Sequence, residues 1–201
     1  LGDATAGRIH IARQPCPSAW PPADTRYNEF WYERGIELTS DKRTSLVIDP
    51  PDGRLPPRMA RTPDPEEEQL SPTEVIARRY DSYENRGTGD RCIMGFNAGP
   101  PMRSSAYNNN VMIFQSPGYV TILNEMVHNA RIIPIGDTAS PPFPQYSGVS
   151  RGHWEGETLV IETTRFRGGS SGLTSPNMHL IERLTRLDPD TVAYEYTVTD
   201  P

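Results

Sequence analysis

The second half of the chain, from residue 111 onward, is a series of short segments rich in alternating apolar and polar residues. The segments are VMIFQ, YVTILNEMV, ARIIPI, TLVIETTRF, MHLIERLTRL and TVAYEYTVT. Turn-forming residues separate several of them, at Ser116-Pro117-Gly118, Gly136-Asp137 and Asp188-Pro189-Asp190. Pro followed by Gly suits a type II turn, because Gly accepts the positive φ that this turn requires. The sequence therefore predicts a mainly β fold, an antiparallel meander that forms a lipocalin-like barrel or a sandwich.

Residues 1–100 are punctuated by proline and predict an extended N-terminal arm. Short strands are expected at RIHIA and TSLVIDP, and one short helix is expected near residues 72–86. Ser71 can cap this helix, Pro72 occupies its first position, and Glu74 completes a Ser-x-x-Glu capping box. The predicted organisation is a Pro-rich arm over 1–100 followed by an antiparallel β-domain over 101–201. Because the chain begins without methionine and stops directly after a strand, we expect it to be incomplete at both ends.

Charge and cysteine content limit the classes of partner and compartment. The net charge is −6 and no basic block is present, which argues against a nucleic-acid partner. No apolar run approaches the length of a membrane-spanning helix. Cys16 and Cys92 lack the spacing of metal ligands, so they are either one disulfide in an oxidising compartment or two separate thiols. We expect no cofactor.

The stretch SRGHWEGETLVIETTRF predicts a β-hairpin with Gly156-Glu157 as its two-residue loop. In this register Trp154 shares a face with the apolar residues of the second strand and is predicted to lie in the core. His153 and Glu155 then project from the other, polar face. The simpler interpretation is that His153 is a surface residue. A catalytic His153–Glu155 pair is the alternative, because residues two apart on a strand project together.

Two pairs of residues have a spacing that would suit a metal ion on a helix. Glu125 and His128 are three apart, and so are His179 and Glu182. On a strand an odd offset places two side chains on opposite faces, so neither pair could hold one ion. We therefore expect no metal site.

The last hairpin, which turns at Asp188–Thr191, is the best candidate for a ligand site. A regular ladder pairs Thr185 with Tyr194 and Arg183 with Tyr196. One face of the hairpin would then hold His179, Ile181, Arg183, Tyr194, Tyr196 and Val198. A ligand cavity has apolar walls and a few placed polar groups, which is what this face predicts. The alternative is an edge strand with Arg stacked on Tyr at the surface.

The candidate ligand-binding residues are therefore His179, Arg183, Tyr194 and Tyr196, with His128 as a further candidate acid–base group. No residue is assigned a catalytic role. The phosphate-binding loop, the Rossmann glycine pattern and the Gly-x-Ser-x-Gly elbow are all absent from the sequence.

Seven segments follow one another in the order YNEFWYERG, RTSLVIDPPDGRLPP, RCIMGFNAGPPM, YNNN, QSPGYVTILNEMVHNARIIPI, SRGHWEGETLVIETTRF and HLIERLTRLDPDTVAYEYTVTDP. Together they resemble a large family of exported bacterial proteins of unknown function. Members of that family begin with an export signal and continue past the last residue of this chain. The resemblance implies a periplasmic or extracellular location. It carries over no catalytic residue, because the family has no established activity.

Two functional hypotheses are compatible with these observations. The first is a non-catalytic exported accessory or binding subunit, which contacts a larger protein assembly, such as a membrane-associated complex, through its extended arm. The second is an enzyme or carrier for a small, partly apolar ligand held inside the β-barrel.

Overall fold

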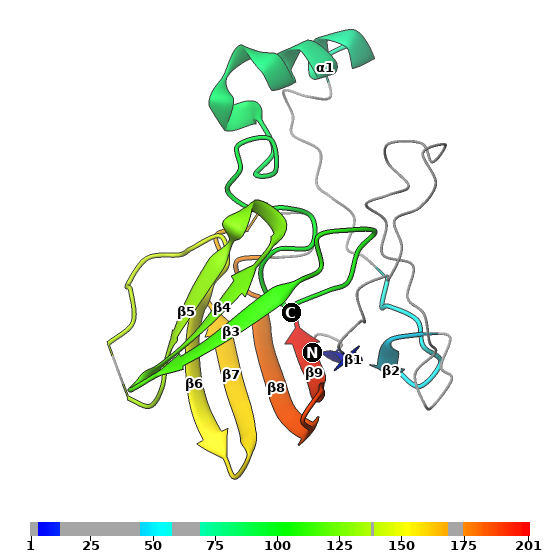
Figure 1. Ribbon diagram of the computed structural model, residues 1–201. Helices are drawn as coiled ribbons and strands as arrows, with labels where there is room; N and C mark the ends of the chain where they lie inside the picture. The colour runs from blue at the N-terminus through cyan, green and yellow to red at the C-terminus, as the bar shows by residue number, and fades with distance from the viewer. Residues whose placement is uncertain (1–3, 13–44, 58–68, 138, 169–174) are drawn as a thin grey trace, which may run out of the picture.

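The computed structural model describes residues 4–12, 45–57, 69–137, 139–168 and 175–201 of the chain. Within these ranges the backbone forms two antiparallel sheets (Figure 1). The six-stranded sheet has the order β2-β1-β9-β8-β7-β6, and the three-stranded sheet has the order β3-β4-β5. The mainly β fold predicted from the sequence is therefore confirmed.

The strands follow the alternating segments closely. The six-stranded sheet consists of β1 (Ala4–Ala12), β2 (Val47–Asp49), β6 (Val149–Glu155), β7 (Thr158–Thr164), β8 (His179–Asp188) and β9 (Thr191–Thr199). The three-stranded sheet consists of β3 (Val111–Ser116), β4 (Tyr119–Asn124) and β5 (Ala130–Pro134). Consecutive strands from β3 to β5, and from β6 to β9, pair with each other, so the meander is confirmed within each sheet.

The predicted lipocalin-like barrel is wrong, because the two sheets do not close on each other. Among the described residues their backbones pair at one corner, where a bridge joins Ile135 to Gly152 and the Gly136 N–H donates to the Gly152 carbonyl oxygen over 2.9 Å. On the far side, β3 and β2 are separate edges among the described strands. The result is a layered arrangement in which the three-stranded sheet lies in front of β6 and β7 (Figure 1).

Two strands come from the region predicted to be an extended arm. β1 pairs antiparallel with β9 over its whole length, from Ala4 opposite Thr199 to Ala12 opposite Thr191, and β2 pairs with β1. The first described segment is therefore part of the six-stranded sheet. Residues 13–44 and 58–68 of the predicted arm lie outside the described residues.

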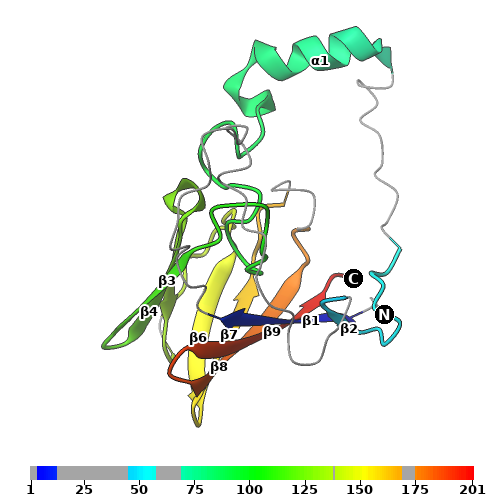
Figure 2. The same cartoon turned by 45° about the vertical axis from the view of Figure 1, so that its right-hand side comes forward.

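The predicted helix is confirmed with its capping box. The helix α1 (Pro72–Asp81) begins after Ser71, whose hydroxyl accepts from the Glu74 N–H, while the Glu74 carboxylate accepts from the Ser71 N–H over 2.8 Å. A short 3-10 helix, η3 (Tyr83–Asn85), follows it. The helix stands clear of both sheets (Figure 2) and leaves Ile76 and Tyr80 exposed to solvent.

The hydrophobic core lies between the two sheets. Its main cluster consists of Val120, Ile122 and Ile133 from the three-stranded sheet, Leu159, Ile161, Leu184 and Tyr194 from the six-stranded sheet, and Met102 from the loop before β3. Burial of these side chains against one another is the main force that holds the two layers together.

The predicted β6–β7 hairpin is confirmed in its register. Its loop is Gly156-Glu157, with Gly156 at a φ of +60°, and Trp154 is opposite Leu159. The prediction that Trp154 lies in the core is wrong, because 46% of its surface is exposed. The hairpin tip extends beyond the end of the three-stranded sheet (Figure 1), so no second layer covers the indole there.

Candidate functional site

The ligand face predicted for the last hairpin does not form, because a β-bulge changes the register. The ladder shifts between Arg186 and Asp188, and beyond it Arg183 is opposite Glu195 while Leu184 is opposite Tyr194. A one-residue shift moves side chains to the other face of a sheet. Tyr194 and Tyr196 therefore share the face of Glu182, toward the core, whereas His179 and Arg183 project outward.

His179 and Arg183 each bind an acidic residue on the outer side of the six-stranded sheet. His179 Nε2 lies 2.7 Å from Glu162 Oε1, and Arg183 Nη2 donates to Glu155 Oε2 over 2.6 Å. Arg183 is half-exposed. Glu195 is directly opposite Arg183 and lies on the same face of the hairpin. Arg183 is therefore a surface ion-pairing residue.

His153 and Glu155 project together, as the parity of the strand predicts. The two side chains approach to 3.2 Å between Nε2 and Oε1, and both are exposed. Hydrogen bonds from Arg183 and then from His153 lower the pKa of Glu155 below its ordinary value. An acid–base pair for catalysis would require a bound substrate within reach, and this pair lies on an open surface.

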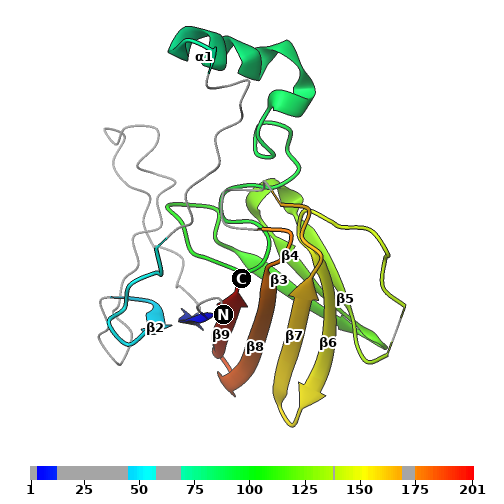
Figure 3. The ribbon, with the colours of Figure 1, turned by 180° about the vertical axis from the view of Figure 1, so that it is seen from behind.

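We call the outer side of the six-stranded sheet the charged face (Figure 3). Its charged and titratable positions are Arg151, His153, Glu155, Glu162, His179, Arg183 and Glu195. At one end a hollow of about 170 Å³ is lined by Ser140, Val149, Arg151, Glu162, Thr164 and Arg165. Ligand pockets for drug-sized molecules are typically about 300–1,000 Å³. The hollow is too small to be the predicted cavity.

A buried ion pair joins the two sheets, and sequence analysis missed it. Arg131 on β5 binds the carboxylate of Glu182 on β8 through both terminal guanidinium nitrogens, with the Nη2–Oε1 distance 3.0 Å. The Tyr194 hydroxyl donates to Glu182 Oε1 over 2.6 Å and accepts from the Met102 N–H over 2.9 Å. Glu182 and Tyr194 are completely buried, and 5% of Arg131 is exposed.

The ionisation of this network follows from burial and mutual charge. Burial acts to lower the pKa of Arg131, but the charge and hydrogen bonds of Glu182 outweigh it and raise that pKa. Burial, and then the negative charge of Glu182, raise the pKa of Tyr194 well above its ordinary value. The tyrosine therefore remains protonated and donates to the carboxylate. Solvent does not reach Glu182 or Tyr194, so this network is a buried link between the two sheets.

The remaining candidates from the sequence are dispersed. His128 is exposed in a second 3-10 helix, η4 (Met126–His128), which follows β4 in the other sheet. Cys92 is exposed, whereas Cys16 lies outside the described residues. The disulfide between them stays a prediction. Within the described ranges, no three His, Cys, Asp or Glu side chains gather as metal ligands, and no helix is long and apolar enough to span a membrane.

The outer side of the three-stranded sheet carries uncharged side chains, in contrast to the charged face. The register places nine side chains on it: Met112, Phe114, Ser116, Tyr119, Thr121, Leu123, Ala130, Ile132 and Pro134. Not one of these nine is charged. We call this surface the apolar face. Antiparallel sheets that face water on one side usually present polar residues there, so this face departs from the common pattern.

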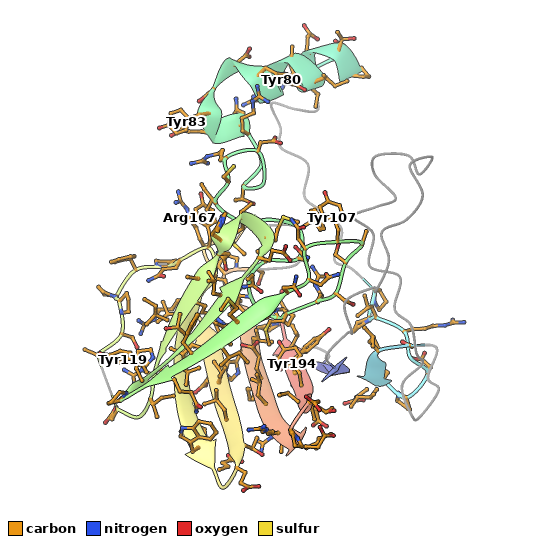
Figure 4. All side chains as sticks on the ribbon, in the orientation of Figure 1. Tyr80, Tyr83, Tyr107, Tyr119, Arg167 and Tyr194 are labelled. Carbon is orange, nitrogen blue, oxygen red and sulfur yellow. The ribbon has the colours of Figure 1, made fainter. Side chains whose placement is uncertain are left out.

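Several large side chains of the apolar face are exposed. The exposed fraction is 56% for Met112, 48% for Phe114, 42% for Tyr119 and 65% for Ile132. Tyr119 lies at the tip of the β3–β4 hairpin, whereas Tyr194 lies in the interior (Figure 4). Contiguous exposed apolar patches on soluble proteins mark sites of interaction more often than isolated apolar residues do.

The strand β3 is also a free edge of its sheet. Pairs in an antiparallel ladder alternate between hydrogen-bonded and non-hydrogen-bonded. The Glu125 N–H donates to the Asn110 carbonyl oxygen over 2.9 Å. The even-numbered residues of β3, which are Met112, Phe114 and Ser116, therefore direct their backbone N–H and C=O groups to β4. The other three residues of β3 direct their N–H and C=O groups to the open side: Val111, Ile113 and Gln115. Within the described chain, no strand pairs with that side.

This edge lacks the features that usually protect edge strands from pairing. Natural edges carry charges, prolines, bulges or a covering element, or they are very short. β3 has six residues without a charge or a proline, and its ladder with β4 is regular. By contrast, β2 has only three residues, and the edge of β6 meets β5 at the corner near Gly152. β3 and the apolar face beside it are therefore the strongest candidate binding surface.

No protein-family model, curated protein or solved structure matches this chain at a significant level. The candidate surface accordingly rests on the geometry and chemistry of the described residues.

Proposed function

We propose that this protein is a non-catalytic binding subunit that holds a partner protein against the apolar face. The observation that carries the proposal is the contrast between the two outer surfaces of the same fold. One carries several ion-paired side chains, and the other presents nine uncharged positions with Met112, Phe114 and Ile132 about half exposed or more. An apolar face of this kind gains free energy when a partner removes it from water.

The composition of the apolar face suits a protein partner better than a small molecule. Aromatic residues and methionine are enriched at the centres of protein interfaces, and charged residues are depleted there. Phe114, Tyr119 and Met112 supply these residue types on one face of the sheet. Because the surface carries no charge of its own, the partner must offer an apolar patch whose centre is free of unpaired charge.

The larger setting is also part of the proposal. The resemblance of the sequence motifs supports a periplasmic or extracellular subunit of a larger assembly, and residues of the N-terminal arm would add to the contact. The apolar face provides an attachment surface that does not depend on the arm, which makes it the part of the proposal that can be tested first.

The test is a pair of lysine substitutions at similarly exposed apolar residues. Ile132→Lys places a charge within the apolar face, where the residue is 65% exposed, and Leu187→Lys places the same charge at the β8–β9 bulge, where the residue is 55% exposed. Affinity capture from native extract, quantified by mass spectrometry, should recover the same partner with the unchanged chain and with Leu187→Lys. Recovery with Ile132→Lys should fall at least about tenfold, because an unpaired charge at an interface costs more than 1.4 kcal/mol.

The outcome that contradicts the proposal is equal recovery of the partner by both variants, since the apolar face would then take no part in binding. A photoreactive phenylalanine analogue at Phe114 gives a second readout. It should cross-link the same partner, whereas the analogue at Tyr80 on α1 should not.

A further inference from the structure

We infer that β3 pairs antiparallel with β3 of a second copy of this chain, so that the two three-stranded sheets become one continuous sheet. This inference rests on the proposed function, because the pairing places two apolar faces side by side and doubles the surface available to the partner. Addition of a strand to an exposed sheet edge is a recurrent mode of protein association.

The backbone of β3 is complementary to itself. Val111, Ile113 and Gln115 direct their N–H and C=O groups to the open edge, and these three residues are symmetric about Ile113. When two copies meet with Ile113 opposite Ile113, the Val111 of each copy is opposite the Gln115 of the other. Every outward-directed group of the three residues then has a hydrogen-bonding partner, in the closed two-fold arrangement that is common for homodimers.

The side chains fit the same register. Met112 of one copy is opposite Phe114 of the second, and thioether–aromatic contacts of this kind are favourable. Because opposite residues share a face, the apolar faces of both copies lie on the same side of the joint sheet. Ile113 projects toward the core side and yet remains 44% exposed at the edge of its sheet. The second copy would cover it.

Charge favours this edge over others as a contact between identical chains. Each chain carries a net charge of −6, so two copies repel each other at distances where charges are unscreened. β3 contributes no charge to the contact. Glu125, the acid next to the strand, accepts a hydrogen bond from the Asn110 side-chain amide over 2.8 Å. Asn110 would be opposite the uncharged Ser116 of the second copy.

Pairing through β3 would enlarge the apolar surface that a partner protein can bind. Stable protein interfaces bury about 800 Å² on each partner, and the apolar face of one copy has only nine positions, several of them small. Two copies joined through β3 present a surface twice as wide and without interruption. The partner would therefore bind the dimer more tightly than it binds a single copy.

The primary measurement is the mass of the 201-residue chain in solution, by sedimentation equilibrium over a wide range of concentration. We expect a dimer of two 22.5 kDa chains. Ile113→Lys places two like charges opposite each other at the two-fold axis and should raise the dissociation constant at least about tenfold. Ile132→Lys is the matched control. It puts the same charge on β5, away from the paired edge, and should leave the dimer intact.

A charge-reversal pair tests the register. Ile113→Lys and Ile113→Glu should each dimerise at least about tenfold more weakly than the unchanged chain, and an equimolar mixture should recover the stronger association, because lysine and glutamate are then opposite each other. Circular dichroism shows whether each variant folds. If neither variant folds, Gln115→Lys takes the place of Ile113→Lys in the sedimentation experiment, because Gln115 is already exposed. It would place a charge opposite Val111 of the second copy and should weaken the dimer.

Three outcomes would overturn the inference. They are a monomeric wild-type chain at every concentration, dissociation by Ile132→Lys in place of Ile113→Lys, and failure of the charge-reversal mixture to associate. Dissociation by Ile132→Lys would indicate that two apolar faces pack against each other. None of these outcomes removes the proposed function, which fails only if Ile132→Lys retains the partner in the capture experiment.

Discussion

Glu182 is an acidic residue at a position where the alternation of β8 calls for an apolar one. Its neighbours of the same parity, Leu180 and Leu184, are buried in the core, and so is Glu182 itself. A buried carboxylate is tolerated only when it is paired and hydrogen-bonded, and Arg131 and Tyr194 provide both conditions. The pattern Leu-Ile-Glu-Arg-Leu therefore contained a signal that a cation from another strand would cross the core.

Substitutions in the buried network should reduce stability in a definite order. Glu182→Gln leaves Arg131 as a buried cation without its counter-charge and should lower the free energy of unfolding by about 3–5 kcal/mol. Tyr194→Phe removes one hydroxyl and leaves the Met102 N–H without its acceptor, at a cost of about 1–3 kcal/mol. Urea denaturation measures both. Tyr196→Phe is the control and should change stability by less than about 0.5 kcal/mol, and an equal loss at all three positions would contradict the network.

On the charged face, Glu155 should remain ionised to a lower pH than an ordinary glutamate. Arg183 and His153 hold its pKa down, so the stabilising interaction is present above the ordinary pKa of glutamate and is lost as the pH falls through the lowered value. Carbon-13 NMR of the side-chain carboxyl should show this titration, and Arg183→Met should shift it back toward the ordinary value. An unchanged titration in Arg183→Met would show that the ion pair does not form in solution.

At the scale of elements, two glycines beside strands adopt a positive φ, and only one of the two is closely packed. Gly148, just before β6, has a φ of +68°, and a Cβ there would lie 2.6 Å from Thr163 Cγ2 and 2.8 Å from Phe166 Cε1. Gly118, in the β3–β4 loop, has a φ of +78° with open space around the same position. The two glycines therefore share the backbone requirement but differ in packing.

Alanine at these two positions separates the two effects. Gly118→Ala should cost only the left-handed conformation, about 1–2 kcal/mol. Gly148→Ala should cost that amount and also the displacement of a core aromatic ring, about 1–3 kcal/mol more. Thermal unfolding followed by circular dichroism provides the comparison. Equal losses at Gly118 and Gly148 would mean that Phe166 moves aside without cost.

At the scale of the whole molecule, local signals in the sequence predicted most of the strands, but they did not predict which side chains of those strands are covered. The capping box at Ser71 and the two-residue loop at Gly156-Glu157 were predictable because each is complete within a few residues. The bulge near Leu187 has no sequence signature of its own, yet it decides which residues face Tyr194. The exposure of Trp154 depends on where the other sheet ends, which no residue of its own hairpin determines.

The candidate binding surface could not be predicted from the sequence, for a related reason. VMIFQ is apolar at nearly every position, so its sequence does not show which of its two faces is covered. Only the position of β3 at the edge of a sheet, with the core on one side of that sheet alone, shows that Met112 and Phe114 project into solvent. The pairing of β1 with β9 is equally inaccessible, because it joins the two ends of the described chain.

That pairing makes residues 4–12 a structural part of the domain. β1 is the only described neighbour of β9 on the side away from β8. Deletion of residues 1–12 would remove a full ladder and leave β9 as a new edge. Net contributions of about 0.5–1.5 kcal/mol per hydrogen bond predict a loss of at least about 3 kcal/mol in the free energy of unfolding. Deletion of residues 1–3, which precede β1, is the control and should cost little. Hydrogen exchange should show faster exchange at β9 amides in the longer deletion alone, and unchanged stability and exchange would mean that residues 4–12 are a detachable arm.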